Sequence, residues 1–505
     1  MAQAQRTGIE IVDITKRFGS VTANDQVCLA VKRGEILALL GENGSGKTTL
    51  MNMLSGIYYP DSGQIYVDGR EVTIRSPKDA FAEGIGMIHQ HFKLVDVLSA
   101  AENIVLGMAG AGRLNRKKLG QEIRGIGERY GFHVDPDKKI YRMSVSEKQT
   151  VEILKVLYRG ADILILDEPT AVLTPQETDR LFDILRAMRD DGKAIIIITH
   201  KLNEVLAVSD RVSVLRRGQS IGTIETKQAD AKTLTAMMVG HEVKMEILRL
   251  PPKEQTLCTV NDLTVRHSDG YLALDGVSFE LKQGEILGVA GVAGSGQKEL
   301  CEALAGLLET ERGGIEVGGV PISGLSPSAQ QKAGVRIGFI PEDRLGMGLV
   351  ASLNIAENLL VRGYRGQKGF TLRRKPAIKQ AEQMIDFLEI NTKGPMQRVS
   401  ELSGGNVQKV LLWRELTESP PMIITAYPTR GLDISSSYMV YDMLTGQKAK
   451  GAGVLFVGED LDVLLELCDR ILVLCGGRVS GVVDARTATK EEIGWMMTDT
   501  GRAQS

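Results

Sequence analysis

The sequence predicts an α/β fold with two tandem domains, each built around a mostly parallel sheet. Two observations lead to this prediction. A chain of 505 residues is longer than one hydrophobic core usually organises. In addition, a glycine-rich motif occurs at 41–48 and again at 291–298, and the same spacing of 250 residues separates Leu50 from Leu300 and Leu54 from Leu304. A repeat that extends well past its motif indicates two copies of one domain.

Each copy has the same local order of elements around its motif. Apolar strands at 33–40 and 283–290 run directly into the glycine-rich segments, and a helix with apolar Leu50, Met53 and Leu54 follows the first of them. Further apolar runs at 163–166 and 195–198 are continuous and rich in β-branched residues, which is typical of parallel strands covered on both faces. Strand, loop and helix in this order are the context that a phosphate-binding loop requires.

A pair of prolines marks the division between the copies. Pro251 and Pro252 stop regular structure. We therefore predict domains at 1–250 and 251–505.

Composition limits the classes of partner. The net charge is −2, so no bulk attraction to nucleic acid or anionic lipid is expected. The first residues lack the apolar core of a signal peptide, and no apolar run approaches the roughly 20 residues that span a bilayer. Membrane contact, if any, is expected to be peripheral. Five cysteines without Cys-x-x-Cys spacing indicate reduced thiols in a cytoplasm.

The first glycine-rich segment predicts a complete phosphate-binding loop. Its glycines let backbone N–H groups close around phosphate oxygens at a helix N-terminus, where Lys47 neutralises the β- and γ-phosphates. The predicted nucleotide-binding residues here are Gly41, Glu42, Asn43, Gly44, Ser45, Gly46, Lys47, Thr48 and Thr49.

Two acidic residues complete this chemistry. The Thr48 hydroxyl and the Asp167 carboxylate are expected to share Mg²⁺, and Glu168 to orient or deprotonate the attacking water. A glycine turn beside a surface lysine would explain the first motif alone. It would not explain Asp-Glu-Pro-Thr at the end of an apolar strand, 167–170.

Together these residues resemble the ATP-binding cassette (ABC) ATPases, twice over nearly the whole chain. By this resemblance Phe18 stacks on adenine, Gln90 is the Q-loop glutamine that also reaches the metal, and His200 is the switch histidine on the γ-phosphate. Taken alone, Phe18 would be core or surface and His200 structural; their order and spacing favour the functional roles. The family further implies ATP as nucleotide, an antiparallel β part and a helical subdomain in each domain, and head-to-tail packing of the two domains.

The family's signature sequence acts on the nucleotide held by the opposite domain. The second copy carries it nearly complete, as Ser403, Gly404, Gly405 and Asn406 after Leu402, with a D-loop aspartate at Asp433. The first copy has Val145, Ser146 and Glu147 after Ser144, and Thr174 at the D-loop position.

Head-to-tail pairing would therefore produce one complete site and one altered site. The complete site combines Lys47, Thr48, Gln90, Asp167, Glu168 and His200 with Ser403, Gly404, Gly405, Asn406 and Asp433. The other has Gln297, Ala426, Tyr427 and Glu459 in place of the lysine, the two acids and the histidine. A purely inert second domain would not need its intact signature. We predict a single hydrolytic site, and leave open whether the altered site binds nucleotide.

The tandem, half-degenerate layout resembles the importer ATPases for simple sugars and nucleosides. Segments 341–344, 402–409 and 428–433 resemble that group, and 89–95 and 158–177 look most like its nucleoside-uptake members. The implied partners are two integral-membrane permease subunits forming a heterodimer and an extracellular or lipoprotein solute-binding protein, with no nucleic acid. The implied location is the cytoplasmic face of the cell membrane, peripheral, with membrane contact through the permeases only.

The permeases would dock on the segment after Gln90, roughly 91–107. Phe92, Leu94 and Val95 there are either an apolar seat or ordinary core. The alternative function is a soluble tandem-cassette ATPase acting on ribosomes or DNA, but such proteins usually keep two working sites and a long charged linker. A non-catalytic assembly module fits poorly with an intact Asp167, Glu168 and His200.

Overall fold

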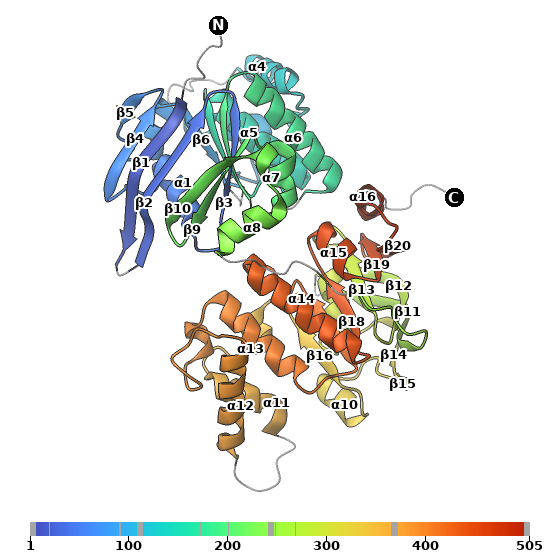
Figure 1. The fold of residues 1–505 in the computed structure, drawn as a ribbon. Coiled ribbons are helices and arrows are strands. Elements are labelled where there is room, and N and C mark those ends of the chain that lie inside the picture. Colours follow the sequence, from blue (N-terminus) through green and yellow to red (C-terminus); the bar gives the residue numbers. More distant parts are fainter. Residues whose placement is uncertain are drawn as a thin grey trace. The chain divides into compact units, whose positions relative to one another are not determined.

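The computed structural model divides the chain into two compact units, Met1–Val243 (unit 1) and Lys244–Ser505 (unit 2), each shown in Figure 1. The structure describes residues 7–19, 21–89, 92–108, 115–171, 173–199, 201–240, 247, 249–267, 269–364 and 372–498. The division precedes the predicted boundary at 250/251. Ile247 packs against the core of unit 2, and Arg249 donates to the Glu466 carbonyl. Prolines end regular structure, but they do not decide which core the preceding residues join.

Unit 1 contains two sheets. The antiparallel sheet has the order β2-β1-β4-β5, with β1 (Thr7–Phe18), β2 (Val21–Lys32), β4 (Ser62–Val67) and β5 (Arg70–Val72). The core sheet has the order β10-β9-β3-β8-β7-β6, with β3 (Glu35–Leu40), β6 (Ile85–Ile88), β7 (Ile163–Asp167), β8 (Ala194–Ile198), β9 (Arg211–Arg216) and β10 (Gln219–Glu225). All pairs in the core sheet are parallel except β9 with β10.

The helices of unit 1 are α1 (Lys47–Leu54), α2 (Pro77–Ala82), α3 (Ala100–Val105), α4 (Arg116–Tyr130), α5 (Val145–Tyr158), α6 (Pro175–Asp190), α7 (Leu202–Val208) and α8 (Ala231–Val239). Most of these helices begin at a capping side chain, whereas α1 and α7 have none. Helices α3, α4 and α5 pack on one another as the helical subdomain.

The core sheet of unit 1 is buried on both faces because successive strand residues point to opposite sides. On β3, Leu37 and Leu39 join α1 and the antiparallel sheet, whereas Ile36 joins the cluster formed by α3 to α6. Helix α1 is thereby enclosed, with Leu50 and Leu54 fully buried. This packing holds the preceding glycine-rich loop at the carboxyl end of β3.

Unit 2 repeats this architecture. Its antiparallel sheet has the order β12-β11-β14-β15, with β11 (Thr256–Arg266), β12 (Leu272–Lys282), β14 (Arg312–Val317) and β15 (Val320–Pro321). Its core sheet has the order β16-β17-β18-β13-β19-β20, with β13 (Ile286–Ala290), β16 (Ile337–Ile340), β17 (Met422–Ala426), β18 (Gly453–Val457), β19 (Arg470–Cys475) and β20 (Arg478–Asp484). The helices are α9 (Gln297–Leu304), α10 (Pro327–Lys332), α11 (Ile355–Gly363), α12 (Arg374–Phe387), α13 (Gly404–Leu416), α14 (Ile434–Ala449), α15 (Leu461–Leu467) and α16 (Lys490–Thr498), with one π-turn, η3 (Arg344–Gly348).

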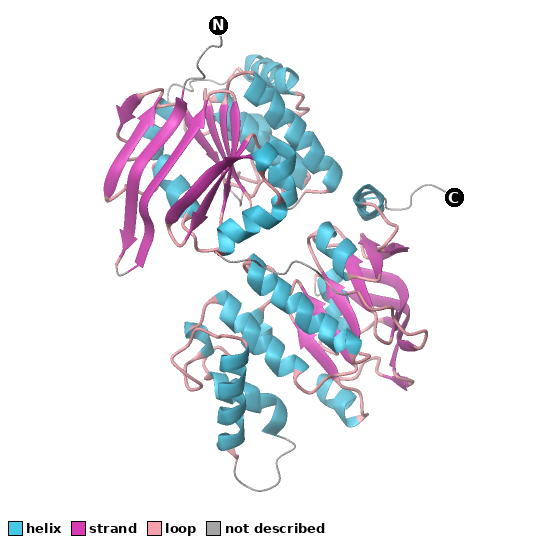
Figure 2. Cartoon of the chain, viewed as in Figure 1, coloured by secondary structure: helices cyan, strands magenta, loops and turns pink. Residues whose placement is uncertain are grey.

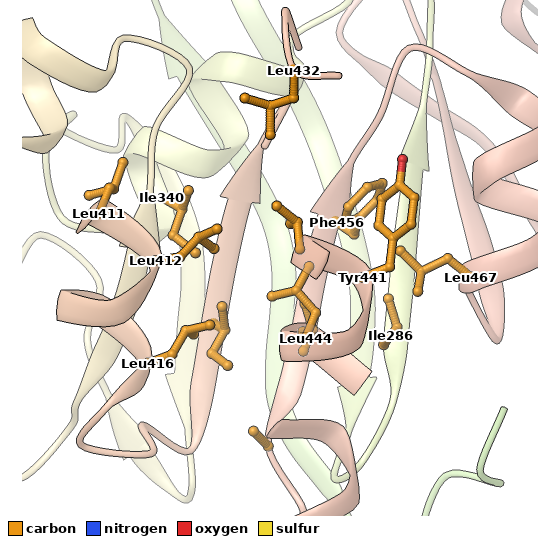
Figure 3. Packing of buried hydrophobic residues seen from close by; sticks show 14 of the residues in the cluster. Ile286, Ile340, Leu411, Leu412, Leu416, Leu432, Tyr441, Leu444, Phe456 and Leu467 are labelled. Atoms are coloured by element: carbon orange, nitrogen blue, oxygen red, sulfur yellow. The ribbon is translucent and has the colours of Figure 1, made fainter. Parts of the chain in front are cut away.

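The larger core of unit 2 lies between its parallel sheet and the helices α11 to α15. Figure 3 shows Leu411, Leu412 and Leu416 of α13 opposite Ile340, with Tyr441 of α14 beside Phe456. Figure 2 shows the helical subdomain of this unit, α11 to α13, extending from the sheet. The predicted fold class is confirmed in both units: a mostly parallel core sheet, an antiparallel β part and a helical subdomain.

No helix among the described residues combines the length and the apolar character needed to span a bilayer.

Candidate phosphate-binding sites

The glycine-rich loop of unit 1 has a backbone that accepts only glycine at critical points. Gly46, which begins α1, has φ 98°, and a Cβ on it would overlap the Ala23 carbonyl oxygen of β2. Because Gly46 has no side chain, no side-chain cap covers the N–H groups at the start of α1. Beside them, Ser45 Oγ is buried without a hydrogen-bond partner among the described residues. Open N–H groups at a helix N-terminus suit a phosphate.

Lys47 lies buried within this loop. Its Nζ donates to the carbonyl oxygens of Gly41 at 2.6 Å and Glu42 at 2.9 Å. Burial lowers the pKa of Lys47, and the carboxylates of Glu168 and Asp167 oppose that shift. The interaction places the predicted loop lysine and the predicted acid pair in one electrostatic site.

The acid pair stands at the carboxyl end of β7. Burial, with a further contribution from neighbouring Glu168, raises the pKa of Asp167 to about 6, while Lys47 acts in the opposite direction. Glu168 has φ 46°, a left-handed conformation that is uncommon for a residue with a Cβ, and its N–H donates to the Ile198 carbonyl at 2.8 Å. Such outliers cost of order 1–3 kcal/mol and concentrate at functional sites.

The donors present fit a nucleotide with Mg²⁺. Thr48 offers a hydroxyl on the first turn of α1 and Asp167 a carboxylate, and oxygen ligands of this kind are what Mg²⁺ prefers. Gln90 and His200 lie outside the described residues, so the structure does not place these two predicted side chains.

Phe18 ends β1 and is 44% exposed. Its ring lies edge-on to Tyr58 at 5.2 Å between centroids. The strand that follows, β2, carries Asn24, whose side-chain amide donates to the Gly46 carbonyl at 3.3 Å. The predicted adenine platform therefore stands on the hairpin that contacts the loop.

Unit 2 keeps the loop backbone and changes its chemistry. Gly296 again has φ 98°, and its Cβ would lie 2.6 Å from the Ala273 carbonyl. Gln297 is buried like Lys47, and its Nε2 donates to the Val292 carbonyl at 3.2 Å. The amide keeps a hydrogen bond within the loop and removes the positive charge.

The strand end of unit 2 shows the same pattern. Tyr427 has φ 50°, and its N–H donates to the Val457 carbonyl at 2.9 Å, which reproduces the backbone of Glu168. Burial raises the pKa of the Tyr427 hydroxyl well above its usual value. Neither Ala426 nor a neutral tyrosine supplies a carboxylate for a metal or a water.

At the signature positions the relation between the units is reversed. In unit 1, Ser144 caps α5 in a capping box with Glu147: Ser144 N donates to the Glu147 carboxylate at 2.8 Å, and Lys138 Nζ donates to it at 2.6 Å. Burial raises the pKa of Glu147, but these bonds outweigh it and the net pKa is lowered. The start of α5 is therefore occupied by the chain's own anion.

The signature of unit 2 has no such internal anion. Ser403 caps α13 by accepting from Asn406 N at 3.4 Å, and no acidic residue lies in the first turn. The Asn406 side chain donates away from the helix, to the Asn391 carbonyl. The α13 N-terminus thus keeps the attraction for phosphate that the α5 terminus has lost.

Asp433 lies close to this signature. It caps α14 by accepting from Ser436 N at 2.7 Å and Ser436 Oγ at 2.9 Å. A Cβ on Gly405 would lie 3.8 Å from that same Ser436 Oγ. The structure therefore brings signature and D-loop together within unit 2. In unit 1 the corresponding cap is Thr174, paired with Glu177.

The segment after Gln90 is partly core and partly exposed. Leu94 packs against the core, whereas Val95 is 40% and Val97 70% exposed. Buried Asn103 holds the segment by accepting from Val95 N at 2.8 Å and donating to its carbonyl at 3.1 Å. Leu94 therefore belongs to the core, whereas the apolar docking seat stays a prediction that only the exposed side chains could serve.

Two arginines of unit 2 have roles that the sequence analysis missed. Arg430 forms ion pairs with Glu342 and Glu459, and Arg344 donates to the Arg430 carbonyl. A comparison of the two copies could have found them. The positions of Gln90 and His200 are taken by the acids Glu342 and Glu459 in the second copy, and an arginine, Arg430, is new beside them.

Comparison with known proteins agrees with this architecture. The family model described as ABC transporter matches residues 24–171 and 274–430. Nucleoside import ATP-binding protein NupA of Lactococcus lactis subsp. cremoris is 42% identical over 98% of both chains, and guanosine import ATP-binding protein NupO of Bacillus subtilis is 42% identical over 97% of both. Ribose import ATP-binding protein RbsA 1 of Streptomyces avermitilis is 39% identical over 96% of this chain and 92% of its own.

Among solved structures, an archaeal ribosome recycling factor in complex with a ribosomal stalk protein matches with a TM-score of 0.61 over 94% of this chain and 90% of its own. At 18% identity this likeness shows the shared fold alone.

Proposed function

This chain belongs to the ABC transporter family, and we propose that it is the ATP-hydrolysing subunit of a bacterial importer for nucleosides or related simple sugars. Membership of the family carries ATP binding and ATPase activity. The solute and the division of labour between the two units are the content of the proposal.

The observation that carries the proposal is the opposite distribution of working parts over the two units. Unit 1 has the buried loop lysine and the acid pair, but its α5 terminus is filled by Glu147. Unit 2 has lost the lysine and both acids, but the first turn of its α13 holds no acidic residue. Head-to-tail pairing would combine the two sets of intact parts into one competent ATP site.

In that site each residue has a defined task. Lys47 and the loop N–H groups bind the β- and γ-phosphates, and Glu168, aimed by its left-handed backbone, orients or deprotonates the attacking water. Ser403 and the α13 terminus close on the γ-phosphate, with Asp433 beside them. Gln90 and His200 are proposed to complete the contacts to metal and γ-phosphate, and Phe18 to stack on adenine. Mg²⁺, held by Thr48, Asp167 and Gln90, would supply charge neutralisation at the phosphates.

Transport requires that the movement of the two units be coupled to membrane subunits that contact them. The exposed Val95 and Val97 in unit 1, and the exposed Met347 and Val350 after β16 in unit 2, offer an apolar surface in each unit. We propose that two permease subunits dock on these surfaces, which would place the chain at the cytoplasmic face of the membrane without a span of its own. An extracellular or lipoprotein solute-binding protein would complete the importer.

The solute assignment rests on the relatives alone, because nothing in an ATPase subunit contacts the solute. A deletion strain should lose uptake of labelled guanosine or adenosine, and the wild-type gene should restore it while the Glu168→Gln variant should not. Competition with ribose and galactose distinguishes nucleoside from sugar import. Unchanged uptake of all these solutes in the deletion strain would contradict the proposal.

A further inference from the structure

One arginine joins three strand ends at the altered site of unit 2. Arg430 follows β17, and its guanidinium pairs with Glu342, after β16, and with Glu459, after β18, at 3.2 Å from Nε to Oε1. Strands β16, β17 and β18 are neighbours in the sheet. A single cation therefore ties together the carboxyl ends of three adjacent parallel strands.

Two of the three residues stand at positions that are proposed to be functional in unit 1. Glu342 lies two residues after β16, as Gln90 lies two residues after β6, and Glu459 lies two residues after β18, as His200 does after β8. Arg430 takes the position of Ala171. Two acids so placed would repel each other without a cation between them. The three changes therefore make sense only as a set.

A second arginine extends the cluster to the signature. Arg344 donates to the Arg430 carbonyl, and its Nη1 lies 3.4 Å from the position that a Cβ on Gly404 would take. Arg430 directly precedes the D-loop segment that ends at Asp433. The cluster thus lies beside the signature and directly before the D-loop, the two elements that unit 2 is proposed to contribute to the competent site.

We infer that Arg430 and Arg344 are positioning residues, which hold the signature and the D-loop of unit 2 in place for ATP hydrolysis on unit 1, without any nucleotide in unit 2. The inference rests on the proposed single composite site. The Arg430 cluster links the three strand ends of unit 2 with a cation that belongs to the chain itself. The ion pairs are half-exposed, so each adds little to stability. Their effect is to fix the positions of the signature and the D-loop, and small displacements of catalytic groups have large effects on rate.

The test is the steady-state ATPase activity of the full chain, assembled with its permeases. Arg430→Gln should lower kcat roughly tenfold, while KM for ATP stays within about twofold because the loop of unit 1 is untouched. Arg430→Lys, which keeps the cation, should recover at least half of the loss. Arg266→Gln, which breaks an exposed ion pair with Glu311 on the antiparallel sheet of unit 2, is the matched control and should not change kcat.

A triple variant separates positioning from simple charge balance. Glu342→Gln, Glu459→Gln and Arg430→Gln together leave no unpaired acid, and kcat should stay as low as in Arg430→Gln. Recovery to the wild-type rate would overturn the inference, and so would a wild-type kcat for Arg430→Gln. If Arg430→Gln does not fold, as judged by its thermal transition, Arg344→Gln replaces it, because it leaves both ion pairs of Arg430 intact; kcat should fall several-fold, and no change would overturn the inference.

The same assay separates failure of this inference from failure of the single-site function. Ser403→Arg should abolish hydrolysis if the composite site exists. Full activity of Ser403→Arg would remove the proposed site and this inference with it. Loss of activity in Ser403→Arg together with normal activity in Arg430→Gln would overturn only the positioning role.

Discussion

Units 1 and 2 share a backbone and differ in chemistry. Gly46 and Gly296 both have φ 98°, and Glu168 and Tyr427 have φ 46° and 50° with equivalent backbone hydrogen bonds to the neighbouring strand. The glycine loop and the strained strand end therefore persist after the lysine and the acids are gone. The packing of each unit requires this backbone geometry, whereas the proposed single hydrolytic site requires the side chains in unit 1 alone.

At the helix N-termini of the two signatures, it is unit 2 that keeps the features expected of a phosphate site. Helices α5 and α13 both begin at a capping serine, but Glu147 occupies the first and nothing acidic enters the first turn of the second. The terminus that carries an acidic residue belongs to the unit with the loop lysine and the acid pair, and the terminus without one belongs to the unit that lacks them. On the proposed pairing, each unit has lost the parts that the other retains.

The largest difference between the two units is expected at Glu168, the carboxylate proposed to act on the attacking water. Glu168→Gln should lower ATP hydrolysis roughly 100-fold or more while ATP binding persists, because the amide keeps the shape and loses the base. Tyr427→Phe, at the equivalent position, should change the rate less than about twofold. The hydrolysis rate of each variant is measured as turnover, and its ATP binding as retention of labelled ATP. Comparable losses in the two variants would show that both units hydrolyse ATP.

The signature serines form the next matched pair. Ser403→Arg should lower kcat roughly 100-fold, because in the proposed site this terminus binds the γ-phosphate, whereas Ser144→Arg should cost less than about threefold. Both substitutions remove a helix cap of similar value, about 1 kcal/mol, so stability is controlled within the pair. Equal effects on kcat would contradict the asymmetry.

A buried ion pair distinguishes the units in stability. In unit 2, Lys448 Nζ lies 2.7 Å from the buried Asp469, which also accepts from Ile286 N; in unit 1 the corresponding Asp210 pairs with the partly exposed Arg189 at 3.2 Å. Lys448→Met should destabilise unit 2 by about 3–5 kcal/mol, because it leaves a buried charge unpaired. Arg189→Met should cost unit 1 about 1 kcal/mol or less. Both tryptophans, Trp413 and Trp495, lie in unit 2, so urea unfolding followed by tryptophan fluorescence reports that unit, and circular dichroism reports both. An unchanged fluorescence transition in Lys448→Met would contradict the expectation.

The smallest effect is on pH dependence and concerns unit 1 alone. The pKa of Asp167 is raised to about 6, so the group is protonated below that pH in the nucleotide-free protein and ionised above it. Metal binding needs the carboxylate, so affinity for Mg²⁺ with ATP should weaken about tenfold per pH unit as pH falls below about 6, and be constant above it. Calorimetric titration between pH 5 and pH 8 measures this, with Asp167→Asn as the control, which should bind weakly at every pH. A flat wild-type profile would argue against Asp167 as a metal ligand.

Much of this molecule follows from local sequence. Gly44 and Gly46 before Lys47 predict the loop, the apolar run before Asp167 predicts its strand, and the positions of Gln297 and Tyr427 predict where chemistry is lost. The loop and the strand are present as predicted because backbone conformation, helix caps and strand burial depend on neighbours in the chain, whereas the loss of chemistry in unit 2 stays a prediction. The predicted boundary at 250/251 differs from the division into two compact units, because the core that Ile247 joins is decided by packing and not by the prolines.

By itself, then, the sequence determined the repeated fold, the loop, the acid pair and the inventory of retained and missing groups. Only the tertiary structure decided what those groups contact. Glu147 reads as a defect in the sequence, but its bond to Lys138 and to the start of α5 makes it an internal anion. Glu459 reads as a loss of the histidine, but Arg430 joins it to Glu342. The reason is physical: helix caps and loops form between near neighbours, whereas an ion pair between residues far apart in the chain exists only after the sheet has brought its strand ends together.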